Sequence, residues 1–240
     1  MTDKKEKPTP CLFSIIIPVL HEAQTINTLL KHIHQTQTNE TYEIIVVDGS
    51  TKKDTIQTIE DPTVITLATS KGRAKQMNAG ADRAKGDVLV FLHADTFLPE
   101  NALIKIRETL KQKKYVGGAF TLDVDSNKPL LKVIATLSTV RSQLTRIPYG
   151  DQVIFLRKTY FEKLGGYPDL PLMEDLELML RIKKSKGKIR ILPNRVVTSA
   201  RRWEHNGAFS TTLVNIFILA LYRIGVPADK LTKWHRYPED

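Results

Sequence analysis

The sequence predicts an α/β protein with a mostly parallel central sheet flanked by helices. Four short apolar runs rich in β-branched residues, at 13–19, 42–48, 64–67 and 88–92, are typical of buried parallel strands. Segments with apolar residues at helical spacing separate them, and this alternation implies right-handed crossovers. The 240 residues fit one large domain, and a hydrophobic content of 41% supports a real core.

The elements of the first half follow from local signals. Pro18 stops the first strand, because Pro cannot donate a sheet hydrogen bond. Asp48 ends the second strand in an Asp-Gly-Ser turn, which is expected to leave its carboxylate exposed at the edge of the sheet. Gly72 allows a tight entry into a helix whose first turn carries Arg73. In chain order we expect strand 13–19, a helix around 26–33, strand 42–48, strand 64–67, a helix from 73, strand 88–92 and a helix over 101–113.

The second half alternates less regularly and ends in a C-terminal helical extension. The most apolar part of that extension, 213–222, is shorter than the roughly 20 residues that span a bilayer. We favour a helix packed on the core, and a helix lying against a membrane surface stays open. The other expected elements are strand 117–124, helix 129–145, strand 153–156, a loop at 165–168, helix 172–181 and short strands at 188–192 and 196–198.

Bulk composition limits the partners and the compartment. The net charge of +10 and the pI near 9.6 indicate an anionic partner. Aromatic content is low and no nucleic-acid-binding motif is present, so we expect no nucleic acid. A single cysteine, Cys11, and a charged N-terminus without an apolar signal core predict a cytoplasmic protein, with peripheral membrane contact as an open alternative.

Polar residues follow the buried run 88–92. His93 and Asp95 come at its carboxyl end, where open α/β sheets bind ligands. A carboxylate and an imidazole two residues apart on a strand can face one cavity and hold a cation or a phosphate. The structural alternative is a turn whose Asp caps the helix begun near Pro99. Both interpretations remain open for this segment taken alone.

Other polar groups are expected at the same edge of the sheet. Asp48 ends a neighbouring strand, and Arg73 lies at a helix start, which suits an anion. Carboxylates for a cation and a guanidinium for phosphate suggest a nucleotide diphosphate with Mg²⁺ or Mn²⁺. Neither a P-loop nor a Gly-x-Gly-x-x-Gly motif is present, which disfavours an ATPase or a dehydrogenase.

The motifs together resemble family 2 glycosyltransferases, inverting enzymes with the GT-A fold. The resemblance covers nearly all of residues 12–230. It implies a metal-dependent, hexosyltransferase-like enzyme that moves a sugar from a UDP- or GDP-sugar to an acceptor hydroxyl, with Mn²⁺ or Mg²⁺ as cofactor. The acceptor and the oligomeric state are not specified. The segments that carry the resemblance are 14–22, 44–50, 72–80, 92–96, 150–152, 173–177 and 199–203.

The resemblance implies roles for individual residues. Asp95 matches the second acid of the family's Asp-x-Asp motif and would bind the cation, whereas His93 replaces the first acid and puts the metal's identity in question. Asp175 matches the general base, with the adjacent Glu174 as the alternative; structurally, both acids could simply favour a helix N-terminus. The implied donor-binding residues are Pro18, Glu22, Asp48, Arg73, His93, Asp95, Arg201, Arg202 and Trp203, and the implied acceptor-binding residues are Gly150, Asp151 and Gln152.

The expected domain organisation is a single GT-A domain with short tails. Two alternatives to an enzyme stay open: a catalytically inactive nucleotide-binding module and a basic membrane-surface protein. The expected divisions are a tail at 1–11, the domain at 12–230, made of a nucleotide-binding half (12–115), an acceptor and catalytic half (116–208) and a C-terminal helix (209–230), and a tail at 231–240.

Overall fold

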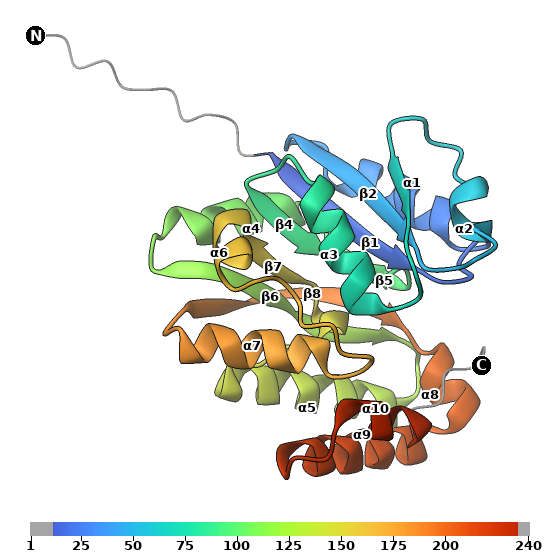
Figure 1. Cartoon of the computed structure of the whole chain (residues 1–240), viewed down its shortest axis with the longest axis vertical. Helices are drawn as coiled ribbons and strands as arrows, with labels where there is room; N and C mark the ends of the chain where they lie inside the picture. The colour runs from blue at the N-terminus through green and yellow to red at the C-terminus, as the bar shows by residue number, and fades with distance from the viewer. Residues whose placement is uncertain (1–11, 235–240) are drawn as a thin grey trace, which may run out of the picture.

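The computed structural model describes residues 12–234 and shows a mixed eight-stranded sheet with helices on both faces (Figure 1). The strand order is β3-β2-β1-β4-β7-β6-β8-β5. The predicted tail at 1–11 and the last six residues of the other tail lie outside the described residues.

Strands and helices alternate through β4, as predicted, and the order then becomes irregular. The strands are β1 (Phe13–Val19), β2 (Tyr42–Asp48), β3 (Ile65–Ala68), β4 (Val88–Phe91), β5 (Thr96–Phe97), β6 (Tyr115–Asp125), β7 (Ile154–Arg157) and β8 (Lys188–Ser199). The helices are α1 (Ile26–Thr36), α2 (Asp54–Gln57), α3 (Arg73–Arg83), α4 (Ala102–Lys111), α5 (Pro129–Thr145), α6 (Lys158–Lys163), α7 (Glu174–Lys184), α8 (Arg201–Asn206), α9 (Ala208–Arg223) and α10 (Ala228–Leu231), with 3-10 turns η1 (Gly150–Gln152) and η2 (Thr232–Trp234).

The central strands are buried on both faces. In β1, Ile15 and Ile17 pack in a cluster with α1, α4 and α5, whereas Ile16 packs in a second cluster with α3, α6 and α7. All three side chains are fully buried. Because both faces of the strand are covered by helices, its sequence is a nearly continuous apolar run rather than an alternating one.

The strand pairing sets up a polar edge. β3, β2, β1 and β4 are parallel neighbours, so their carboxyl ends lie at the same edge of the sheet. β7 joins β4 in the antiparallel sense, and four of the seven pairings are parallel. The predicted α/β class is therefore confirmed, with antiparallel strands added on the β7 side.

Several expected bounds differ from the structure by one to three residues, and the break expected between the two last strands is wrong. The two short strands expected at 188–192 and 196–198 form the single strand β8. A register shift against β6 falls where Pro193 and Asn194 interrupt the apolar pattern. The hydroxyl of Thr121 donates to the carbonyl oxygens of both residues, at 2.9 and 2.8 Å. This bulge accommodates the proline without ending the strand.

The predicted helix at 129–145 is confirmed as α5, and the apolar C-terminal segment forms α9. Ile218 of α9 is buried with Leu172 and with Leu231 of α10, so packed structure continues one residue beyond the expected end of the domain. Within residues 12–234, none of the helices has the length and apolar content needed to cross a membrane.

Candidate active site

The carboxyl ends of β1, β2 and β4 carry polar residues, as predicted. Pro18 is the penultimate residue of β1 and is half-buried beside Val47 of β2. Glu22 follows β1, and its Oε1 lies 2.9 Å from the guanidinium of Arg201. The topology thus brings together residues that are 179 positions apart in sequence.

Asp48 has a structural role that the sequence did not predict. The side chain is fully buried, so the expectation that the turn leaves its carboxylate exposed is wrong. Oδ1 accepts a hydrogen bond from the backbone N–H of Ser50 at 2.7 Å, and Oδ2 accepts from those of Thr55 and Ile56 at 3.2 and 3.3 Å. Asp48 therefore ties the loop after β2 to the start of α2.

Arg73 is the first residue of α3, where the helix dipole also favours an anion. Its Nη1 lies 3.4 Å from Oε1 of the buried Glu174, across 101 residues of sequence. The charge of Arg73 also acts on His93, Asp95 and Asp175, since it lowers the pKa of each. The structure therefore places this guanidinium at the centre of the predicted site.

Gly150 joins two of the predicted residues. Its backbone N–H donates to Oδ2 of Asp175 at 3.0 Å. A Cβ atom added at Gly150 would lie 2.5 Å from Nε2 of His93 and 2.6 Å from Oδ2 of Asp175. Both side chains therefore fill the space that a larger residue would need, and glycine here allows them to approach each other.

Asp175 has the protonation behaviour of a base at neutral pH. Burial, with a smaller contribution from the neighbouring charges of Glu174 and Asp151, raises the pKa of this carboxyl to about 7, although Arg73 and the N–H of Gly150 oppose the shift. Its Oδ1 atom is buried and has no hydrogen-bond partner within the described chain. A buried oxygen without a partner, on a carboxyl group that titrates near neutrality, can accept a proton from a ligand.

His93 is a neutral imidazole. Burial, and secondarily the charge of Arg73, lower its pKa to about 3. Its Nε2 atom is buried and has no hydrogen-bond partner among the described residues. A neutral ring at this position can accept or donate one hydrogen bond or ligate a transition metal, but it adds no charge to the site.

Asp95 and Asp151 form the acidic part of the site. Burial raises the pKa of both carboxyls; Glu22 adds to the effect on Asp95, whereas the guanidiniums of Arg73 and Arg201 oppose it. Oδ1 of Asp151 is buried without a hydrogen-bond partner in the part of the chain that the structure describes. The negative charge of Asp95 also raises the pKa of Asp151.

The donor set suits a cation that shares its ligands with a substrate. Residues 12–234 contain no group of three or more His, Cys, Asp or Glu side chains placed to hold a metal ion. A single carboxylate such as that of Asp95 is nevertheless a usual protein contribution where substrate phosphates and water complete the coordination of Mg²⁺. The residues therefore fit a cation that arrives with a diphosphate.

The Arg-Arg-Trp segment begins α8, beside the same edge. Arg201 pairs with Glu22, and Arg202 donates to Oδ1 of Asn215 on α9 at 3.1 Å. Trp203 is partly buried against the core cluster that contains α5. The two arginines lie close enough to act on the acids of the site, whereas the tryptophan packs beneath them.

Gln152 differs from the other predicted acceptor residues. It is fully buried, and its Nε2 donates to the carbonyl oxygen of Phe120 at 2.9 Å and to the hydroxyl of Ser142 at 3.0 Å. These bonds link η1 to β6 and α5. Gln152 therefore supports the loop that carries Gly150 and Asp151.

Two residues of the site were not predicted. Tyr167 is buried against Phe91, and the nearby charges of Asp175 and Glu174 add to burial in raising its pKa, so it stays protonated. Arg141 of α5 lies over the ring of Tyr149 at 3.5 Å and its charge lowers the pKa of Asp151. The signals available were a tyrosine after Gly165-Gly166 and a second cation in the helix at 129–145, and neither is specific.

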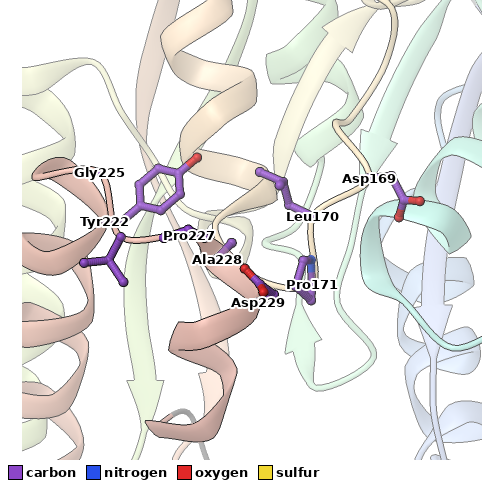
Figure 2. Close-up of a pocket in the computed structure, with 9 residues that line it drawn as sticks. Asp169, Leu170, Pro171, Tyr222, Gly225, Pro227, Ala228 and Asp229 are labelled. Carbon is purple, nitrogen blue, oxygen red and sulfur yellow. The ribbon is translucent and has the colours of Figure 1, made fainter.

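A separate open pocket of about 610 Å³ lies between the loop at 169–171 and residues 222–229, where α9 turns into α10 (Figure 2). Tyr222 lines this pocket, and its hydroxyl donates to Oε2 of Glu177 at 3.4 Å. None of the predicted site residues lines the pocket. The pocket is therefore distinct from the polar edge.

Comparison with known proteins identifies the family. The model described as "Glycosyl transferase family 2" matches residues 14–165, which include the carboxyl ends of β1 to β4 and Gly150, whereas Asp175 and the Arg-Arg-Trp segment follow the match. The chain belongs to glycosyltransferase family 2.

Relatives and solved structures agree with this assignment. The chain is 30% identical over 188 residues to an uncharacterized glycosyltransferase of Haemophilus influenzae, covering 71% of this chain and 62% of that protein. It is 26% identical to the probable glycosyltransferase YdaM of Bacillus subtilis, covering 80% of this chain and 50% of that protein. The chain thus spans less than two thirds of the length of either relative.

The fold is that of GT-A glycosyltransferases. A mannosyltransferase from Pyrobaculum calidifontis, solved with GDP-Man and Mn²⁺, superimposes with a TM-score of 0.66 at 20% identity, covering 91% of this chain and 66% of that chain. TarS of S. aureus, residues 1–349, superimposes with a TM-score of 0.62 at 14% identity, covering 92% of this chain and 68% of that chain. The predicted fold is confirmed.

Proposed function

We propose that this family 2 glycosyltransferase catalyses inverting transfer of a sugar from a nucleotide-diphosphate sugar to an acceptor hydroxyl. The observation that carries the proposal is the carboxyl of Asp175, buried beside Gly150 with a pKa of about 7. A general base is most effective when its pKa lies near the working pH.

The donor would lie along the polar edge. Arg73, Arg201 and Arg202 supply positive charge suited to the diphosphate, and Pro18 and Glu22 at the end of β1 would contact the base or ribose. The predicted donor is a UDP- or GDP-sugar, and the structural relative that was solved with GDP-Man and Mn²⁺ supports a nucleotide-diphosphate sugar. Asp48 would contribute by fixing the loop next to the nucleotide, given its three backbone hydrogen bonds.

Asp175 would accept the proton of the acceptor hydroxyl. The acceptor oxygen forms a bond to the anomeric carbon from the face opposite the diphosphate, and the bond from that carbon to the leaving oxygen breaks with its electron pair on the phosphate. Glu174, the alternative base, is less suited, because its carboxylate already faces Arg73 at 3.4 Å. Gly150 and Asp151 would line the acceptor side, with Gln152 beneath them.

Asp95 would hold Mn²⁺ or Mg²⁺ together with the donor phosphates. When bound, the cation supplies positive charge that offsets the charge on the departing nucleotide diphosphate. His93, neutral and beside Gly150, would hydrogen-bond a donor hydroxyl or act as a second ligand for a transition metal. A cytoplasmic location remains a prediction.

A thermal-shift screen of nucleotide-sugars with Mn²⁺ or Mg²⁺ tests donor binding. At a ligand concentration of about 100 times Kd, binding stabilises the folded state by about 2.7 kcal/mol. We expect a rise in Tm of roughly 5–10 °C for the true donor, and a smaller rise without metal. A rise in Tm without release of nucleotide in the presence of any acceptor would favour the inactive binding module, and no rise with any nucleotide-sugar would contradict the proposal.

Gly150→Ala is expected to displace the two side chains that lie against the backbone of Gly150. The new Cβ would lie at 2.5–2.6 Å from His93 and Asp175, so both side chains must shift. We expect destabilisation of about 1–3 kcal/mol in urea unfolding, together with a loss of turnover. Gly165→Ala is the matched control: φ is +78° there but no atom lies within 4 Å, so strain of roughly 1–2 kcal/mol should leave turnover unchanged. Normal turnover in Gly150→Ala would contradict this reading of the site.

A further inference from the structure

Two helices, α5 and α9, lie at one end of the molecule's long axis and carry most of its exposed apolar surface (Figure 1). In residues 12–234, every exposed large apolar side chain except Leu180 lies on these helices or in the segment after α9. We call this set the apolar face. Its members are Leu130, Val133, Leu137, Val140 and Leu144 on α5, Phe209, Leu213, Ile216 and Phe217 on α9, and Ile224 and Trp234 beyond.

The apolar face follows helical geometry. On α5 the exposed residues recur every three or four positions and form a stripe opposite the buried Leu131 and Ala135. On α9 the exposed residues likewise lie opposite the buried Ile218. Single exposed apolar residues are ordinary on protein surfaces, but an organised set marks a surface that binds something.

The two helices that carry the stripes begin close together. Lys128, directly before α5, forms an ion pair of 3.3 Å with Glu204 of α8, the helix that precedes α9. Ile134 of α5 and Ala208, the first residue of α9, pack against the same core cluster. The starts of both helices are therefore held at the same place.

The charges carried by α5 and α9 themselves have one sign, and the acids nearby pair with lysines, Glu204 with Lys128 and Asp123 with Lys132. Neither α5 nor α9 contains an Asp or a Glu, whereas both contain cations, with Lys132 and Arg141 on α5 and Arg223 on α9. Arg146 is exposed immediately after α5. We propose that the apolar face docks on an anionic lipid surface, with its apolar side chains among the acyl chains and its cations at the headgroups.

A second copy of the chain fits this surface less well. The chain carries a net charge of +10, so pairing of two apolar faces would bring like charges together. Trp234 is 55% exposed and contacts the ring of Phe217, with centroids 5.5 Å apart. An exposed indole beside a phenyl ring is typical of the membrane–water interface.

Docking would place the active site beside the lipid surface. Arg141 of α5 acts on Asp151, and Asn215 of α9 accepts a hydrogen bond from Arg202, so the sides of both helices reach the polar edge. The binding proposal does not depend on the proposed catalytic function, because its test measures association alone.

Flotation of the full chain with phosphatidylcholine vesicles, with and without phosphatidylglycerol, tests the proposal at physiological salt. We expect flotation with the anionic vesicles and a blue shift of tryptophan emission. Leu137→Glu/Ile216→Glu changes two residues that are 62% and 58% exposed, so the fold should persist, and flotation should fall roughly tenfold or more. Leu180→Glu, at the 40% exposed apolar residue outside the face, is the matched control and should float like the unmodified chain.

Three results would overturn the proposal. They are no flotation of the unmodified chain with anionic vesicles, equal flotation with and without phosphatidylglycerol, and flotation of Leu137→Glu/Ile216→Glu at the level of the control. A dimer in sedimentation velocity that this double variant abolishes, without any vesicle binding, would assign the face to a second copy instead. Circular dichroism of both variants verifies that they are folded.

Discussion

Replacing Asp175 with Asn is expected to lower kcat for sugar transfer by about 10²–10⁴, the range associated with loss of a general base. The amide has nearly the same shape and its oxygen can still accept the hydrogen bond from the N–H of Gly150, which is 3.0 Å long in the structure. The variant therefore removes proton acceptance and leaves the geometry in place. The measurement is the rate of nucleotide release with a saturating donor and acceptor.

Stability separates this effect from misfolding. The carboxyl of Asp175 has a pKa of about 7 when folded, against an ordinary value of 3.8, so the folded protein binds this proton more tightly than the unfolded chain. Stability from this group is therefore lost as the pH rises from about 4 to 7. Asp175→Asn removes that loss, and its Tm at pH 8 should equal or exceed that of the unmodified protein.

Glu174→Gln is the control for the choice of base. Glu174 faces Arg73 at 3.4 Å, so its loss should weaken donor binding through Arg73 and raise KM more than it lowers kcat. A larger loss of kcat in Glu174→Gln than in Asp175→Asn would transfer the role of base to Glu174.

Asp95→Ala is expected to abolish the response to divalent metal and to lower kcat by about 10²–10³, the loss found when one group that stabilises developing charge is removed. Its carboxylate is the one predicted metal ligand, and it lies beside Glu22, Arg73 and Arg201 at the end of β4. Mn²⁺ titrations of activity, and of the Mn²⁺ electron paramagnetic resonance signal in the presence of nucleotide diphosphate, measure the effect.

Asp87→Ala is the matched control for Asp95. Asp87 is exposed and precedes β4 at its amino end, away from the polar edge. This variant should keep the Mn²⁺ requirement and the turnover of the unmodified protein. If Asp95→Ala responds to Mn²⁺ as Asp87→Ala does, Asp95 is not a metal ligand.

The elements that the sequence predicted well are those whose signals are local. Strand 13–19, strand 42–48 and helix 129–145 have the predicted bounds, because an apolar run or a Pro at a helix start decides each of them. The sequence predicts two strands where the structure has β8, because a proline such as Pro193 usually ends a strand. Only the pairing with β6 shows that a bulge accommodates this proline within one strand.

The candidate site was predictable in position but not in detail. The predicted strand order brings the motif residues to the carboxyl edge of the sheet. The hydrogen bond from Gly150 to Asp175, however, joins residues 25 positions apart, and the contact of Arg73 with Glu174 joins residues 101 positions apart. Such contacts depend on tertiary packing. The burial of Asp48, whose carboxylate accepts three backbone hydrogen bonds, was missed for the same reason.

The pH dependence of the transfer rate tests the role of Asp175 most directly. Because a base must be deprotonated to act and the pKa of Asp175 is about 7, kcat should rise tenfold per pH unit below 7 and level off above about pH 8. Asp175→Asn should lack this rise, and its residual rate should be flat across the same range. A flat profile for the unmodified protein, or the same rise near pH 7 in Asp175→Asn, would contradict the assignment of Asp175 as the catalytic base.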